Sequence, residues 1–122
     1  MNNVFRIQDY LRHLQEATER IATYIEDVDE MAFLQMPLVQ DAVIRNLEII
    51  GEACNNILKT APEFAEAHPE IPWTSAIGAR NALSHGYFKV DLAVVWTTVQ
   101  EDLPALYEAV TAILADMSSH IG

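Results

Sequence analysis

Apolar residues recur every three or four positions along the first part of the chain, which is the spacing of one face of an α-helix. The members of this stripe are Val4, Ile7, Leu11, Leu14, Ile21, Ile25 and Val28, with Thr18 filling one slot. A second, broader stripe follows Pro37, which a first helical turn tolerates, and extends to Leu58. Two long helices are therefore predicted, over residues 4–28 and 37–58.

Gly51 lies inside the second stripe. A glycine within a helix costs about 1 kcal/mol relative to alanine. The simplest reason to keep it is the close approach of a neighbouring backbone, which we therefore expect at this position.

Three prolines make the next stretch a connector rather than a long helix. They are Pro62, Pro69 and Pro72. Residues 63–68 could still form one or two helical turns. Pro72 suits the first position of a third helix over residues 73–84, and Gly86 is placed to end it.

The last part of the chain predicts one more helix, broken once. Asp91 is a good N-cap for it, and its apolar residues recur as far as Met117. Pro104 falls inside the pattern, so a kink is expected near residues 100–103. The predicted fold is all-α, a bundle of four or five helices.

Composition agrees with one helical domain over residues 1–122. The 122 residues are 51% hydrophobic, which is enough for a single core, and include only 4 Gly and 5 Pro. Cys54 is the single cysteine, so no internal disulfide is possible, and no signal peptide or membrane span is evident. We expect a cytoplasmic protein that does not enter a membrane.

The charge balance restricts any contact with nucleic acid. The formal net charge is -11, and only seven Lys and Arg residues are present. Because phosphate binding rests on these cations, the composition argues against a broad nucleic-acid surface. Such chemistry would need a small local pocket or the help of a basic partner.

The densest collection of reactive groups lies between Gly78 and Phe88, and includes Arg80, His85 and Tyr87. Cleavage of RNA through its own 2′-hydroxyl needs a group that moves protons and a cation beside the phosphate; His85 and Arg80 match these roles. Positions five apart on an α-helix point about 140° away from each other. Either the helix is distorted before Gly86, or the two groups meet across a subunit interface.

The reactive residues could instead have purely structural roles. A lone Arg is usually a surface cation, and a lone His is more often hydrogen-bonded structure than a catalyst. No metal site is predicted, because the four histidines are scattered: His13, His68, His85 and His120. Ser84 and His85 are adjacent without a third orienting residue, which disfavours acyl transfer. Trp73 and Trp96 are expected in the core or at an interface.

Three blocks of the chain resemble the HepT-like branch of the HEPN superfamily. Arg80, His85 and Tyr87 fit its Arg-x4-His-x-Tyr signature, including the Asn that often follows the Arg. Residues 41–53 read DAVIRNLEIIGEA, residues 70–73 read EIPW, and residues 80–96 read RNALSHGYFKVDLAVVW. The three blocks occur in the family's order, and the resemblance covers nearly the whole chain.

The resemblance implies a metal-independent ribonuclease toxin that needs no cofactor and works as a homodimer with a HEPN-like helical bundle. The Arg and His of the signature carry over to Arg80 and His85, and Asn81 is a supporting residue that could equally cap the helix. Related systems pair the toxin with an MntA-type nucleotidyltransferase antitoxin, which transfers AMP onto the motif tyrosine, here Tyr87. Added phosphoryl charge beside the cation would block RNA phosphate.

Two alternatives stay open at the level of sequence. In the first, the chain is a non-catalytic HEPN-like module in which Arg80 and Tyr87 recognise a nucleotide or a partner. In the second, it is a structural adaptor bundle in which Arg80 and His85 are dispersed and exposed.

Overall fold

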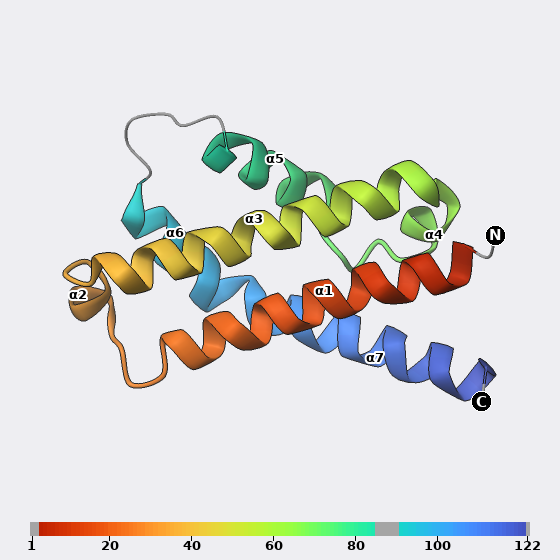
Figure 1. Ribbon diagram of the computed structural model, residues 1–122, viewed down its shortest axis with the longest axis horizontal. Coiled ribbons are helices and arrows are strands. Elements are labelled where there is room, and N and C mark those ends of the chain that lie inside the picture. Colours follow the sequence, from red (N-terminus) through yellow and green to blue (C-terminus); the bar gives the residue numbers. More distant parts are fainter. Residues whose placement is uncertain (1–2, 85–90, 122) are drawn as a thin grey trace.

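The structure, a computed structural model, describes residues 3–84 and 91–121. Within these residues the chain forms helices and no strand (Figure 1). The helices are α1 (Asn3–Tyr24), α2 (Glu30–Phe33), α3 (Pro37–Thr60), α4 (Pro62–Ala67), α5 (Trp73–Ser84), α6 (Leu92–Glu101) and α7 (Leu103–Ile121). The predicted all-α class is confirmed, with a HEPN-like helical bundle as its architecture.

Helix α3 lies at the centre of the bundle. It packs against α1 on one side and against α5 on the other, while α1 also packs against α7 (Figure 1). Inward residues of all seven described helices, together with Ala61 and Ile71 between them, form one apolar core. Those of α1, α3, α6 and α7 are largely the residues of the predicted stripes. The fully buried members with the largest side chains are Phe33, Leu11, Leu14, Ile21, Ile57 and Ile71.

Thr18 occupies its slot in the apolar stripe without an unpaired hydroxyl. The residue is buried, and its Oγ1 donates a hydrogen bond to the Gln15 carbonyl at 2.7 Å. A hydroxyl in the core is tolerated when a backbone carbonyl accepts from it.

Helix α1 is shorter than predicted. It ends at Tyr24 rather than at Val28, because the chain turns and Asp27 adopts a left-handed backbone with φ of 62°. Asp enters this region more readily than most residues with a side chain. Ile25 and Val28 still pack against the core, so the apolar periodicity continued beyond the helix itself.

The four-residue helix α2 was not predicted. Asp29 caps it by accepting a hydrogen bond from the Ala32 N–H at 2.8 Å, and Phe33 is its buried residue. One turn is too short to show a helical period in the sequence.

The break in the last helix and its cap are confirmed. Asp91 accepts hydrogen bonds from the N–H groups of Ala93 (3.0 Å) and Val94 (3.3 Å). The helix is interrupted at Asp102, just before Pro104, so that α6 and α7 are separate. Together with α2 and α4, this break explains why the structure has more helices than the four or five expected.

Across the described ranges, the helices lack a segment that is both long and apolar enough to cross a membrane.

Candidate active site

Helix α5 carries Arg80 and lies along α3 (Figure 1). Its first residue, Trp73, is buried and donates through Nε1 to the carbonyls of Ala65 (3.1 Å) and His68 (3.0 Å). The Trp73 side chain therefore fixes the start of α5 to the connector, as expected of a core anchor.

Gly51 of α3 lets α5 lie directly on α3. A Cβ atom added at Gly51 would collide with Cβ of Arg80 and would lie 2.7 Å from the Ala76 carbonyl oxygen and 3.0 Å from Cγ of Arg80. The close backbone approach expected at Gly51 is confirmed. The neighbour is the helix that carries Arg80, so the aliphatic stem of Arg80 rests on the one residue of α3 that has no side chain.

Arg80 is half-buried at this contact. Its guanidinium offers five N–H donors in a planar fork, which suits a phosphate oxygen. A charged group whose stem is packed loses less conformational entropy when it binds a ligand than one on a fully exposed stem. Arg80 thus has the properties of an anion-binding cation held in place at its base.

The other residues of the signature lie outside the residues whose side chains the structure describes. His85 and Tyr87 fall between the two described ranges, and Asn81 belongs to α5 without a described side chain. Their expected convergence with Arg80 therefore stays a prediction. Helix α5 ends at Ser84, one residue before His85.

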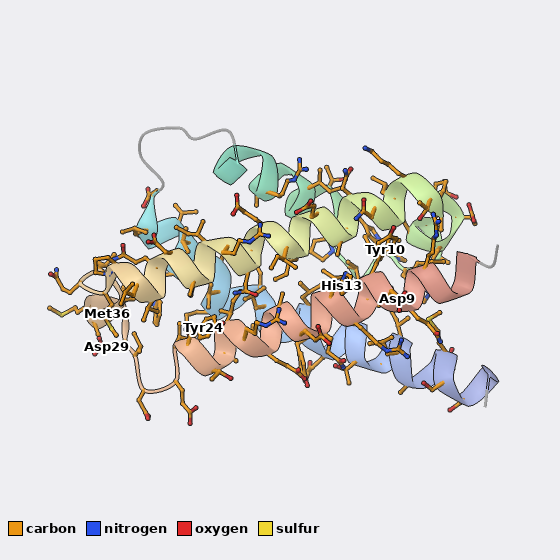
Figure 2. All side chains as sticks on the ribbon, viewed as in Figure 1. Asp9, Tyr10, His13, Tyr24, Asp29 and Met36 are labelled. Atoms are coloured by element: carbon orange, nitrogen blue, oxygen red, sulfur yellow. The ribbon has the colours of Figure 1, made fainter. Side chains whose placement is uncertain are left out.

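Two histidines outside the signature have described side chains, and neither lies on helix α5. His13 is exposed on α1, where its ring lies 6.4 Å from that of Tyr10 (Figure 2). His68 follows α4 and its Nδ1 lies 3.1 Å from Oε2 of Glu70. A backbone hydrogen bond, then the His68 side chain, lowers the pKa of the Glu70 carboxyl. In the described ranges no group of three His, Cys, Asp or Glu residues could hold a metal ion.

A groove of about 500 Å³ lies between α1 and the α6–α7 break. Its lining is mostly apolar and includes Ile21, Ile25 and Leu103, and Glu19 is its one charged lining residue. The hydroxyl of Tyr107 donates to Oε2 of Glu19 at 2.9 Å. A groove without a Lys, Arg or His among its lining residues does not fit an RNA phosphate.

Two polar or reactive groups, Asn46 and Cys54, are buried on α3. Asn46 lies within the second stripe, between the apolar residues Val43 and Leu47; its Nδ2 donates to the Ala42 carbonyl (2.9 Å) and its Oδ1 has no partner among the described residues. The polar side chain itself, in an apolar row, was the available signal. Burial raises the pKa of the Cys54 thiol to about 12, so Cys54 is not a nucleophile at neutral pH.

The chain matches the family model described as "Ribonuclease HepT-like" over residues 14–113. It is 46% identical over 99 residues to "Probable ribonuclease HepT" of Thermococcus cleftensis, which covers 81% of this chain and 87% of that relative. It is 35% identical over 105 residues to a protein of Caldanaerobacter subterraneus subsp. tengcongensis that is named as a candidate RNase, covering 86% of this chain and 91% of the relative.

A longer relative from Methanocaldococcus jannaschii is 38% identical over 114 residues, which are 93% of this chain and 50% of that protein. Its name joins a gamma-glutamylcyclotransferase to a candidate RNase. No solved structure matches this chain. Because the family model spans most of the chain and the Thermococcus relative is matched over nearly its whole length, this chain belongs to the ribonuclease HepT-like family and is a ribonuclease.

Proposed function

We propose that this ribonuclease is an endonuclease, which cuts RNA at internal positions of the RNA strand. It does so without a metal ion, using Arg80 and His85. The observation that carries the proposal is the packing of Arg80 on Gly51, which holds a permanent cation in one place on α5. The motif Arg-x4-His-x-Tyr in a chain of this family adds the proton-transferring group five residues later.

The proposed reaction is attack by the RNA's own 2′-hydroxyl on the adjacent phosphorus. The bond from O2′ to phosphorus forms, the bond from phosphorus to O5′ breaks, and the proton of the 2′-hydroxyl leaves as O5′ gains one. His85 is suited to one or both proton transfers, because its unperturbed pKa is about 6.5. Arg80 stabilises the negative charge that grows on the phosphate oxygens.

We further propose that the enzyme is a homodimer in which the two motifs line a shared cleft. Helix α5 contacts α3 on one side, while Thr74, Ser75, Gly78 and Ala79 on its other side are exposed. A Cβ atom at Gly78 would meet nothing within 4 Å among the described residues. A face of such small residues would let a second copy approach α5 closely.

The regulatory part of the proposal is that the chain is the toxin of a toxin–antitoxin pair. In this scheme, a nucleotidyltransferase antitoxin of the MntA type transfers AMP from ATP to the Tyr87 hydroxyl. The new bond joins the tyrosine oxygen to the α-phosphorus of ATP, and pyrophosphate leaves. Each added phosphoryl group places negative charge near the cation that receives the RNA phosphate.

The test of cleavage uses the purified chain with RNA and excess EDTA. We expect wild type to cut, and both Arg80→Ala and His85→Ala to lose cleavage by about 100-fold or more. Arg12→Ala is the matched control, because Arg12 is an exposed cation on α1, away from α5, whose NH1 lies 3.6 Å from Oδ1 of Asp9. Equal activity of wild type and His85→Ala would point to a contaminating nuclease and would refute the proposed site.

The test of regulation uses intact-mass spectrometry of the chain after incubation with ATP, Mg²⁺ and the nucleotidyltransferase of the adjacent gene. Wild type should gain whole AMP units. Tyr87→Phe keeps the ring and lacks the acceptor oxygen, so it should gain none and should keep cutting RNA. AMP addition to the Phe variant would place the acceptor on another residue.

A further inference from the structure

Large apolar side chains are exposed around helix α2, at one end of the bundle (Figure 1). Met31 is 79% exposed and Leu38 is 86% exposed, while Leu34 and Met36 are 39% and 37% exposed. These four residues lie within eight consecutive positions, so they form one local patch, which we call the α2 surface. Figure 2 shows Met36 and Asp29 at this end of the molecule.

The α2 surface rests on a well-supported segment. Phe33, between Met31 and Leu34, is fully buried, and its ring lies 5.2 Å from that of Trp96 on α6. The Gln40 side chain donates to the Phe33 carbonyl at 2.9 Å, and Asp29 caps α2. Because these contacts hold the backbone of the segment in place, the four exposed side chains project from an ordered part of the structure. Exposed apolar residues grouped in this way are typical of protein–protein contact sites.

Exposed carboxylates flank this surface along the sequence. Residues 21–44 hold five acidic residues and no Lys or Arg, and the exposed cations Arg20 and Arg45 bound the segment. The acidic residues are Glu26, Asp27, Asp29, Glu30 and Asp41. All five are exposed. An apolar centre with a charged, solvated rim has the anatomy of a protein interface.

The sign of the rim decides which molecule can occupy the surface. RNA is disfavoured, because its phosphates would face five carboxylates, and the nearest cations in the sequence, Arg20 and Arg45, lie on either side of this segment. Two copies of the chain joined through this surface would place one acidic rim against another, which costs binding free energy. A partner protein with a basic rim would instead gain binding free energy from contact with these carboxylates.

We propose that the α2 surface docks a partner protein whose contact face has an apolar centre ringed by Lys and Arg. A standard interface buries about 800 Å² on each partner, so Met31, Leu34, Met36 and Leu38 would form its centre and the carboxylates its edge. Methionine suits this role, since its flexible thioether adapts to the shape of a partner.

The nucleotidyltransferase is the natural probe, and this choice rests on the proposed function. The α2 surface belongs to α2 and the start of α3, whereas Arg80 lies on α5. Substitutions in the surface therefore leave the proposed catalytic residues unchanged. RNA cleavage by the chain alone is measured in parallel, and its loss in wild type would count against the proposed cleavage without bearing on docking.

The experiment measures the affinity of the purified nucleotidyltransferase for wild type, Leu38→Glu and Leu58→Glu by calorimetry. Leu58 lies on the same helix, about 30 Å further along at 1.5 Å per residue, and is 37% exposed. We expect Leu38→Glu to weaken binding by about tenfold or more and Leu58→Glu by less than about twofold. Circular dichroism of each variant verifies that its helices remain intact.

A second arm tests the charge of the partner's rim. Glu30→Lys with Asp41→Lys should weaken binding, and the affinity of wild type should fall as salt is added, since the rim contacts are solvated. Three results overturn the proposal: wild type does not bind the nucleotidyltransferase, Leu38→Glu binds it as wild type does, or light scattering shows that Leu38→Glu turns a dimer into a monomer. The last result would make the α2 surface an interface between copies of this chain.

Discussion

At the scale of single residues, Gly51 and Arg80 depend on each other, because the aliphatic stem of Arg80 occupies the space that a side chain at position 51 would fill. Gly51→Ala adds one methyl group. The higher helix propensity of alanine raises the free energy of unfolding by about 1 kcal/mol, whereas crowding at the contact lowers it by about 1–3 kcal/mol. The net loss of stability is therefore up to about 2 kcal/mol, and because the added methyl group meets Cβ of Arg80 and the Ala76 carbonyl oxygen, helix α5 must shift and Arg80 moves with it.

We expect Gly51→Ala to lower kcat for RNA cleavage by about 10- to 100-fold with a smaller change in KM, since a misplaced cation acts mainly on the transition state. The control is Ile57→Val, a buried position on the same helix where loss of one methyl costs about 0.5–1.5 kcal/mol. If Ile57→Val lost as much kcat as Gly51→Ala at equal stability, general loosening of α3 would explain both results.

Cys54 supplies a second prediction at this scale. The pKa of the buried thiol is about 12 in the folded chain, against an ordinary value of 9.0. Folding therefore favours the protonated thiol: its contribution to stability is complete below pH 9 and is lost as the pH rises toward 12. At pH 8, a thiol reagent should label Cys54 only as fast as the chain unfolds, and quickly in denaturant. Rapid labelling under native conditions would contradict the burial of Cys54.

At the scale of elements, Asp91 ties the start of α6 to its first turn through two hydrogen bonds. Removing an N-cap of this kind costs about 1 kcal/mol. Asp91→Ala should therefore lower Tm by about 3–6 °C in a calorimetric scan. Asp91→Asn keeps an accepting oxygen and should melt within about 1–2 °C of wild type. Equal losses in both variants would assign the effect to the carboxylate charge instead of to the cap.

The sequence predicted the long elements well and the short ones poorly. An apolar stripe that begins after Pro37 was sufficient for α3, and the Asp91 cap for the start of α6, because periodicity over several turns reports burial directly. The prediction of α5 depended instead on Pro72 and Gly86 as its boundaries. The end of α1 was wrong, since Ile25 and Val28 reach the core from a turn. Helix α2 depends on one buried ring, Phe33, whose contact with Trp96 joins distant parts of the chain.

The candidate site was predictable in composition but not in geometry. The motif identified Arg80 from the sequence, and Gly51 predicted a close contact without naming the partner. That the partner is Arg80 depends on how α5 lies on α3, which is a tertiary contact that no local pattern encodes. The exposure of Met31 and Leu38 was likewise hidden, because apolar residues beside a predicted helix are ordinarily assigned to its buried face.

At the scale of the whole molecule, a net charge of -11 limits how RNA can bind. With phosphate contacts confined to Arg80 and its surroundings, few counterions are released, and the slope of log K against log salt should be shallow. About two contacted phosphates would give a slope near -1.4 for a single strand. This slope can be measured from the binding of the inactive variant His85→Ala to fluorescent RNA at several salt concentrations. A slope steeper than about -4 would require a broad cationic surface and would refute a local site.

The shared cleft of the proposed homodimer can be tested with two inactive variants. Arg80→Ala and His85→Ala, unfolded and refolded together, form mixed dimers as half of the population if pairing is random. If Arg80 of one copy works with His85 of the other, each mixed dimer holds one intact site and one site lacking both groups. The mixture should then recover about a quarter of wild-type cleavage, whereas each variant refolded alone recovers none. No recovery, with light scattering showing that mixed dimers have formed, would place both catalytic groups of a site within one chain. Helix α5 would then have to end so that Arg80 and His85 converge, despite the angle of about 140° between positions five apart on a regular helix.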